Sequence, residues 1–149
     1  MMKNKSFVLV GMIVSLLAGV LNGQSGVEIH AAASSAVSGW KQMSSPNGIA
    51  LWVAPEVRLT SADIAKAQAY TDPEAGPSVS ILLTDEGAKK MAALSAEQNN
   101  QQIALLLDGQ VIWAPKVRGP MGKEGRLTGG PGGLTQQQID RLLASFKAK

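Results

Sequence analysis

Hydrophobic and polar positions divide the chain into an amino-terminal part without a regular period and a patterned remainder. Residues 6–21 form an unbroken apolar run that follows Lys3 and Lys5 and ends at a polar, glycine-containing segment. This order of basic, apolar and small residues is typical of an export signal. The run is shorter than the about 20 residues that a membrane-spanning helix needs. We therefore predict a signal peptide over residues 1–23, cleaved at a position between there and about residue 33.

Residues 24–47 carry the weakest pattern after the apolar run. They are rich in serine, alanine and glycine and hold no sustained apolar period of 2.0 or 3.6 residues. Such a composition is typical of a flexible tether. We predict a flexible lead-in over 24–47, followed by a folded domain over 48–149. His30 lies in the lead-in with no second metal ligand nearby, and we expect it to be solvated.

From residue 49 onward, the apolar period alternates between values typical of strands and of helices. Threonines with the spacing of N-caps stand at Thr60, Thr84 and Thr135. Strands are predicted over 49–54, 67–71, 79–83, 103–107, 110–114 and 126–128, a short helix or turn over 60–66, and helices over about 85–98 and 135–146. In the first of these helices, Ala88, Met91, Ala92 and Leu94 form the expected apolar stripe.

The pair Asp108-Gly109 separates two apolar runs and predicts a hairpin, because a type I′ turn needs positive φ at both central residues. The run before it, 103–107, is nearly continuous, as in a strand that is covered on both faces. Together these elements predict an α+β domain, in which two principal helices pack on one face of a mostly antiparallel sheet.

Composition excludes several kinds of chemistry. The chain has no cysteine and one histidine, which excludes disulfides, thiolate zinc sites, cysteine nucleophiles and multi-histidine metal centres. Residues 1–23 hold two of the 14 basic residues and none of the 11 acidic ones, so without them the formal charge falls from +3 to +1. We therefore expect no nucleic-acid partner, no cofactor and no metal.

Acidic residues remain as candidates for catalytic side chains. Asp85 and Glu86 are expected to stabilise a helix N-terminus, where carboxylates suit the helix dipole. A hydrolase that uses Asp108 with Glu124 or Asp85 is an alternative, although nothing in the spacing places two acids across a cleft. The glycine-rich segment 129–133 lacks the lysine and hydroxyl of a phosphate-binding loop, and we interpret it as a turn.

Several of these segments, between Val79 and about Phe146, resemble the head subdomain of the large periplasmic domain in the SecD and SecDF protein-export subunits. The matching stretches are 79–88 (VSILLTDEGA), 103–111 (IALLLDGQV) with Ala114-Pro115 soon after, and 127–129 (LTG) before a threonine-capped helix. The segment 60–64 (TSADI) also resembles the family. The hairpin with its Asp-Gly and Ala-Pro pairs is the most specific of these features.

This resemblance implies an exported, non-enzymatic module that contacts a polypeptide or an envelope partner protein. The chain has no room for the several membrane helices of SecD-type subunits, so we do not expect a proton-driven motor. Exposed strand edges and a cationic loop beside Trp113 suggest that an extended chain docks there by strand addition. The candidate contact residues are Trp113, Lys116, Arg118, Lys123 and Arg126. Core packing is the alternative for Trp113.

A second interpretation is a structural accessory of an envelope complex, held at the membrane by an uncleaved leader. Local thinning of the bilayer would accommodate a span as short as 6–21. In either interpretation the protein is exported, and it meets the membrane through its leader alone, if that leader is retained.

Overall fold

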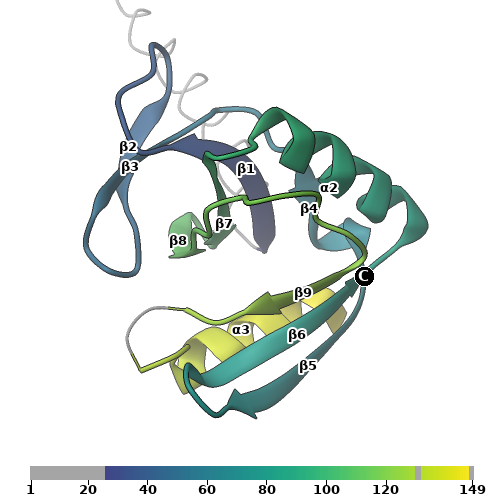
Figure 1. Ribbon diagram of the computed structural model, residues 1–149. Coiled ribbons are helices and arrows are strands. Elements are labelled where there is room, and N and C mark those ends of the chain that lie inside the picture. Colours follow the sequence, from purple (N-terminus) through teal and green to yellow (C-terminus); the bar gives the residue numbers. More distant parts are fainter. Residues whose placement is uncertain (1–25, 130–131, 148–149) are drawn as a thin grey trace, which may run out of the picture.

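The computed structural model describes residues 26–129 and 132–147, so the expected signal peptide lies outside the described residues. Figure 1 shows the arrangement of the strands and helices. The elements are β1 (Val27–Ala33), β2 (Lys41–Ser44), β3 (Ala50–Val53), β4 (Leu59–Thr60), the 3-10 turn η2 (Ser61–Asp63), β5 (Ile64–Asp72), β6 (Gly76–Leu83), α2 (Asp85–Glu97), β7 (Gln102–Leu107), β8 (Gln110–Trp113), β9 (Glu124–Leu127) and α3 (Gln136–Lys147).

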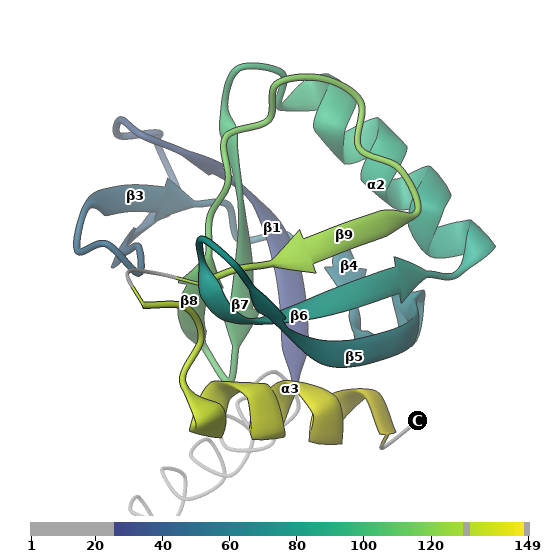
Figure 2. The ribbon, with the colours of Figure 1, turned by 60° about the horizontal axis from the view of Figure 1, so that its bottom comes forward.

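The expected α+β class is confirmed, and every strand pair among the described residues is antiparallel. The strands form two sheets where the sequence pattern predicted one. The larger sheet has the order β2-β3-β1-β7-β8, with β4 paired to β1, and the smaller has the order β5-β6-β9. The two sheets face each other, with α2 closing one end of the space between them and α3 the other (Figure 2).

This space holds the main core, to which both sheets and both helices contribute large aliphatic side chains. Ile29 and Leu105 reach it from the larger sheet, Ile81 from the smaller sheet, and Leu94 and Leu142 from the two helices. A second, smaller core lies on the other face of the larger sheet. It consists of Ala32, Leu51, Val53, Ala104, Leu106 and Val111, with Met43 and Ala114 packed against it.

The expectation of a flexible lead-in over 24–47 is wrong for the described part of that segment. Strand β1 lies in the middle of the larger sheet and pairs with β7 over six residues, from Val27 to Ala32. Val27, Ile29 and Ala31 face the main core, and Ala32 faces the second core. Apolar and polar residues alternate from Val27 to Ala31, but this alternation is short and runs into further small alanines, so it does not form a sustained period. The folded unit therefore includes β1 and does not begin at 48.

The expectation that His30 is solvated is also wrong, since 5% of its surface is exposed. Its Nδ1 lies 2.7 Å from the carbonyl oxygen of Ala54, and its Nε2 lies 2.9 Å from Oε1 of Glu28. The ring thus links the middle of β1 to the residue that follows β3. A buried polar side chain with two partners meets the general requirement for satisfying such groups.

The turn and the caps that the sequence predicts are present in the structure. Asp108 and Gly109 have φ of 52° and 86°, as the predicted hairpin turn requires. The hydroxyl of Thr84 accepts from the N–H of Gly87, and that of Thr135 from the N–H of Gln138. The capping box at Thr60 is present, but it starts only the turn η2, because β5 begins at Ile64.

The buried face of α2 differs from the expected stripe. Met91 and Leu94 are buried as predicted, whereas Ala92 is exposed and Gly87 and Ser95 are buried instead. A Cβ built on Gly87 would lie 2.5 Å from the carbonyl oxygen of Asp63. The first turn of α2 therefore packs so closely on η2 that only glycine fits there.

Candidate functional site

Trp113 lies at the end of β8 and belongs mainly to the core. Its exposed fraction is 9%, and it contacts the main core. The register of β8 against β7 shifts between Leu105 and Leu106, which is a β-bulge. The bulge turns both Ile112 and Trp113 toward the main core, while Val111 faces the second core. Alternation along the hairpin could not show which way Trp113 points, because the bulge interrupts it.

The loop that carries the candidate cations runs along α2. Backbone and side-chain hydrogen bonds fix this path, from the N–H of Asn100 to Val117, from the N–H of Met121 to Ser95, and from the N–H of Leu83 to the carbonyl of Lys123. Lys116 and Arg118 thus lie near the end of α2 and Lys123 near its start, about 20 Å away at 1.5 Å per residue. The loop is cationic, as predicted, but its charges do not form one patch.

Arg126 lies in another place again, on β9. It lines the open face of the smaller sheet together with Lys66, Gln68, Ser80 and Glu124, around a hollow of about 550 Å³. The structure therefore does not bring the five candidate residues together. Trp113 lies in the main core, Lys116 and Arg118 lie near the end of α2, Lys123 lies near its start and Arg126 lies on the smaller sheet.

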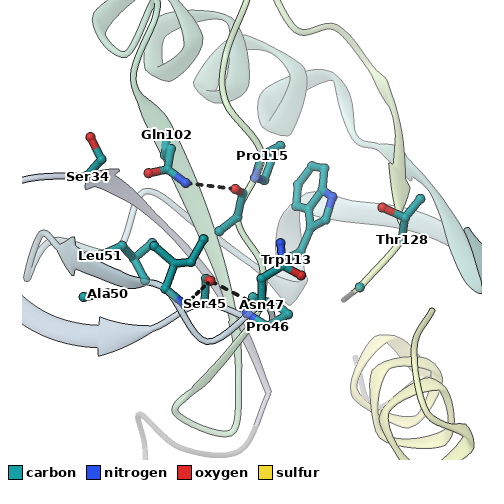
Figure 3. A pocket seen from close by; sticks show the side chains of 13 residues that line it. Ser34, Ser45, Pro46, Asn47, Ala50, Leu51, Gln102, Trp113, Pro115 and Thr128 are labelled. Atoms are coloured by element: carbon teal, nitrogen blue, oxygen red, sulfur yellow. Dashed lines mark hydrogen bonds between the residues drawn. The ribbon is translucent and has the colours of Figure 1, made fainter. Parts of the chain in front are cut away.

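A different set of residues surrounds Trp113 and forms a pocket of about 240 Å³ (Figure 3). We call it the Trp113 pocket. Its walls come from the end of β8, from the β2–β3 turn, from β3 and from the segment after β9, and they include Ser45, Pro46, Ile49, Leu51, Gln102, Trp113, Pro115 and Thr128. Ile49 projects from the β2–β3 turn with 65% of its surface exposed. None of the lining residues is charged.

A second hollow of about 580 Å³ adjoins the Trp113 pocket at Ser45 and Pro46, which line both. We call it the Lys41 pocket. Residues of β2 line one side, the start of β8 the other, and the first turn of α3 closes it, with Lys41, Met43, Ser44, Gln110, Val111 and Gln138 among the lining residues. Lys41 is its one charged residue. Both pockets therefore present amides, hydroxyls and apolar groups, and neither holds an acid.

The acids considered for catalysis lie apart. Asp85 Oδ1 accepts from Lys123 Nζ at 2.8 Å, and this hydrogen bond, together with the lysine charge, lowers the pKa of Asp85. Asp108 Oδ2 accepts from Nε of Arg141 at 2.9 Å. Glu124 is the one acid on the three hollows described above. No pair of these acids shares a hollow, so the geometry gives a hydrolase no support.

The described residues offer neither a metal site nor a membrane span. Across 26–129 and 132–147, no three histidine or acidic side chains are grouped so that they could hold a metal ion. In that part of the chain neither α2 nor α3 combines the length and the apolar character needed to cross a bilayer.

The family model of the SecDF P1 head subdomain matches residues 37–146. The match covers well over half of the chain. The protein belongs to the SecDF P1 head family. The resemblance inferred from the hairpin and the capped helices is thereby confirmed, and the match extends into the β2–β3 region, which those motifs did not include.

Curated relatives of this head include the protein translocase subunit SecD of Acidaminococcus fermentans, 36% identical over 88 residues, which are 58% of this chain and 21% of the relative. SecD of Elusimicrobium minutum is 33% identical over 94 residues, 62% of this chain and 19% of the relative. The chain thus spans about a fifth of the length of these relatives.

Solved structures agree on the fold. One, described as a membrane component SecDF that enhances protein export, matches with a TM-score of 0.64 and 23% identity, over 89% of this chain and 67% of that one. A crystal structure of SecDF in its super-membrane-facing form matches with a TM-score of 0.57 and 24% identity, over 87% of this chain and 19% of that one. Both matches cover a larger share of this chain than the family model, which begins at residue 37.

The residues of β2 and of the β2–β3 turn that line the two pockets were not predicted as site residues. A signal was present, because Ser45-Pro46-Asn47-Gly48 has strong turn chemistry and separates two segments that pair as a hairpin. The weak pattern of the preceding residues led to their assignment as a tether. Ile49, which the sequence pattern predicts as the first residue of a strand, lies in the turn before β3 and is exposed.

Proposed function

We propose that this protein is an exported, non-enzymatic module that binds polypeptide outside the cytoplasm. The observation that carries the proposal is the Trp113 pocket, a charge-free hollow with an exposed isoleucine at its rim. Peptide-binding hollows that do not select for sequence combine apolar surface with groups that can bond to a backbone. The relatives include a protein translocase subunit and a membrane component that enhances protein export, which supports a polypeptide as the bound molecule.

The chemistry of the pocket favours polypeptide over other ligands. A nucleic acid would need clustered cations, whereas the candidate cations Lys116, Arg118 and Lys123 are spread along α2, and Arg126 lies on the smaller sheet. A charged small molecule would need a charged partner, which the lining of the Trp113 pocket lacks. Amide and hydroxyl side chains such as Gln102, Ser45 and Thr128 suit the neutral N–H and C=O groups of a peptide backbone.

Titration of the mature protein with a reduced, alkylated and therefore unfolded protein tests the proposal. We expect saturable binding by calorimetry at moderate salt, and none with the same protein in its folded form. Ile49→Asp should weaken binding, because it places a charge at the apolar rim, whereas Val57→Asp, at the other exposed large apolar residue, should not. Absence of heat at a saturating concentration of the unfolded protein would overturn the proposal.

The leader decides between a free and an anchored module. Cleavage after the alanines at 31–33 would remove β1 from the centre of the larger sheet, so we place the expected cleavage before Val27. Amino-terminal sequencing of the exported protein tests this. A start between residues 20 and 27 supports a free module, and an intact Met1 supports the accessory held at the membrane by its leader.

A further inference from the structure

The two edges of the larger sheet run in the same direction. The sheet order β2-β3-β1-β7-β8 contains four neighbouring pairs, all of them antiparallel. Direction therefore reverses four times between β2 and β8, and the two edge strands are parallel to each other. A single strand placed between them could be antiparallel to both.

The sheet also curls so that these two edges approach the same place. Met43 of β2 and Val111 of β8 both pack on the second core. Residues of both strands line the Lys41 pocket, and the Trp113 pocket is lined by the end of β8 and by the turn that follows β2. We call the two pockets together the β2–β8 crevice. No strand pairing joins β2 to β8 in the described part of the chain, so the sheet resembles a barrel with one strand missing.

Backbone groups of β2 point into this crevice. The N–H of Ser45 donates to the carbonyl of Ile49 at 2.9 Å. In an antiparallel ladder alternate residues face the same partner, so Met43 and Lys41 also face β3. Gln42 and Ser44 therefore direct their N–H and C=O groups away from β3, toward the crevice.

Strand β8 presents backbone groups from the other side. Its turn has two residues, Asp108 and Gly109, so Leu107 and Gln110 form the hydrogen-bonded pair that closes the hairpin. The next residue, Val111, then faces away from β7. The crevice is thus bordered on both sides by unpaired edges of the same sheet.

We infer that the β2–β8 crevice takes up one extended polypeptide segment, which pairs with both edges and closes the barrel. This inference rests on the proposed function and adds the place, the direction and the mode of binding. The segment runs antiparallel to β2 and β8, so its amino end lies at the Trp113 pocket and its carboxyl end at the Lys41 pocket. Because main-chain hydrogen bonds supply the contacts, the site accepts many sequences.

The residues that line the crevice favour a pattern of side chains in the bound segment. Side chains on one face of the inserted strand point toward the second core, where Leu51, Val111 and Met43 are apolar. Those on the other face point away from it. A segment that alternates valine with threonine fits this pattern. The expected occupant is therefore an unfolded, moderately apolar stretch of polypeptide.

N-methylated peptides test insertion between two edges against addition to one edge. The probe is a ten-residue peptide that alternates valine and threonine between terminal lysines. We expect that methylating either set of alternate amides weakens binding about tenfold or more, because each set pairs with a different edge. If methylation of only one set weakens binding, the peptide adds to a single edge. If methylation of neither set weakens it, the backbone of the peptide is not paired. Either result overturns the inference, but the proposed function still holds as long as the peptide binds.

Proline substitutions locate the edge on the protein. Gln42→Pro removes an outward N–H and should weaken binding of the unmethylated peptide about tenfold. Ala69→Pro is the matched control on β5. The carbonyl of Pro77 accepts from Leu134, on the side away from β5, so its partner Thr71 faces outward, and by alternation Ala69 does too. Equal affinity for the Gln42→Pro variant and the original protein would overturn the inference.

Disulfide capture tests direction and does not depend on the proline variants. The chain has no cysteine, so a single introduced cysteine reports one position. Ile49→Cys should capture a peptide with cysteine near its amino end, and Gln110→Cys one with cysteine near its carboxyl end. The reverse pattern, or capture of both peptides at both positions, overturns the antiparallel arrangement.

Two further outcomes are decisive. No binding of any peptide or unfolded protein would overturn the proposed function and this inference together. A second copy of the chain is another possible occupant, and sedimentation would detect it as a dimer that the peptide dissociates. In that case the crevice is an interface between copies, and the inference of a polypeptide occupant is overturned.

Discussion

The two cores of this head domain differ in how completely they are enclosed. The main core is covered by two sheets and two helices and is filled by large aliphatic side chains. The second core is a small cluster, and the larger sheet leaves it open between β2 and β8. We propose that the two cores differ in role, so that the main core stabilises the fold and the second core provides the binding surface of the proposed function.

Truncation of one leucine in each core gives the largest expected effects. Leu105 is fully buried in the main core, so Leu105→Ala should lower the free energy of unfolding by about 4 kcal/mol. Leu51 is also buried, but it lines the open Trp113 pocket, so Leu51→Ala should lower it by about 2 kcal/mol. Urea denaturation of the two variants measures both. Equal losses would remove the distinction between the cores.

Gly87→Ala tests how tightly the main core is closed at the start of α2. The added methyl group would meet the backbone of Asp63 at 2.5 Å, so the helix must shift. Overpacking should cost about 2 kcal/mol in unfolding free energy, even though alanine is the better helix former. Thermal denaturation checks this, with Gly119→Ala, whose Cβ would meet nothing, as the control. A stability equal to that of the original protein would contradict the close packing.

His30→Leu tests the polar link on the face of β1 that bears the second core. The substitution introduces an apolar side chain of similar size and removes the hydrogen bonds to Ala54 and Glu28. We expect a loss of about 1–2 kcal/mol, since the carbonyl of Ala54 is left without this partner. Denaturation at neutral pH measures the loss. A solvated histidine, as the sequence suggested, would give no change.

The smallest effect concerns the exposed ion pair at the start of α2. Lys123 lowers the pKa of Asp85, first through its hydrogen bond and then through its charge. A carboxyl whose pKa is lowered on folding contributes stability above its unfolded pKa, and that contribution is lost as the pH falls through the folded value. Lys123→Gln should therefore lower stability slightly at pH 7 and leave it unchanged well below about pH 4. A larger difference in acid than at pH 7 would contradict this direction.

Local chemistry explains which parts of this fold could be predicted. The Asp108-Gly109 turn and the caps at Thr84 and Thr135 were predicted, because each depends on residues within four positions of one another. Strand β1 was not, because its burial arises from pairing with β7, 70 to 80 residues later in the sequence. Apolar and polar residues alternate only from Val27 to Ala31, so a local window gives a weak signal.

The candidate site likewise could be predicted only where it depends on residues that are close in the sequence. Trp113 was identified as a candidate, but the bulge that turns it inward has no local signature in the sequence. The crevice requires β2 and β8, which are far apart in the chain, to meet on one small core. The cationic residues are close in the sequence, which favoured a single patch, but Lys116 and Lys123 lie near opposite ends of α2.

Amide hydrogen exchange with and without the valine–threonine peptide tests the central claim most directly. The amides of Gln42 and Ser44 face the crevice, so we expect their exchange to be fast in the free protein and strongly slowed when the peptide is bound. The amide of Ala69, at the edge of β5, should be unaffected. Protection along β5 with unchanged exchange at Gln42 and Ser44 would contradict the claim that the open core is where polypeptide binds.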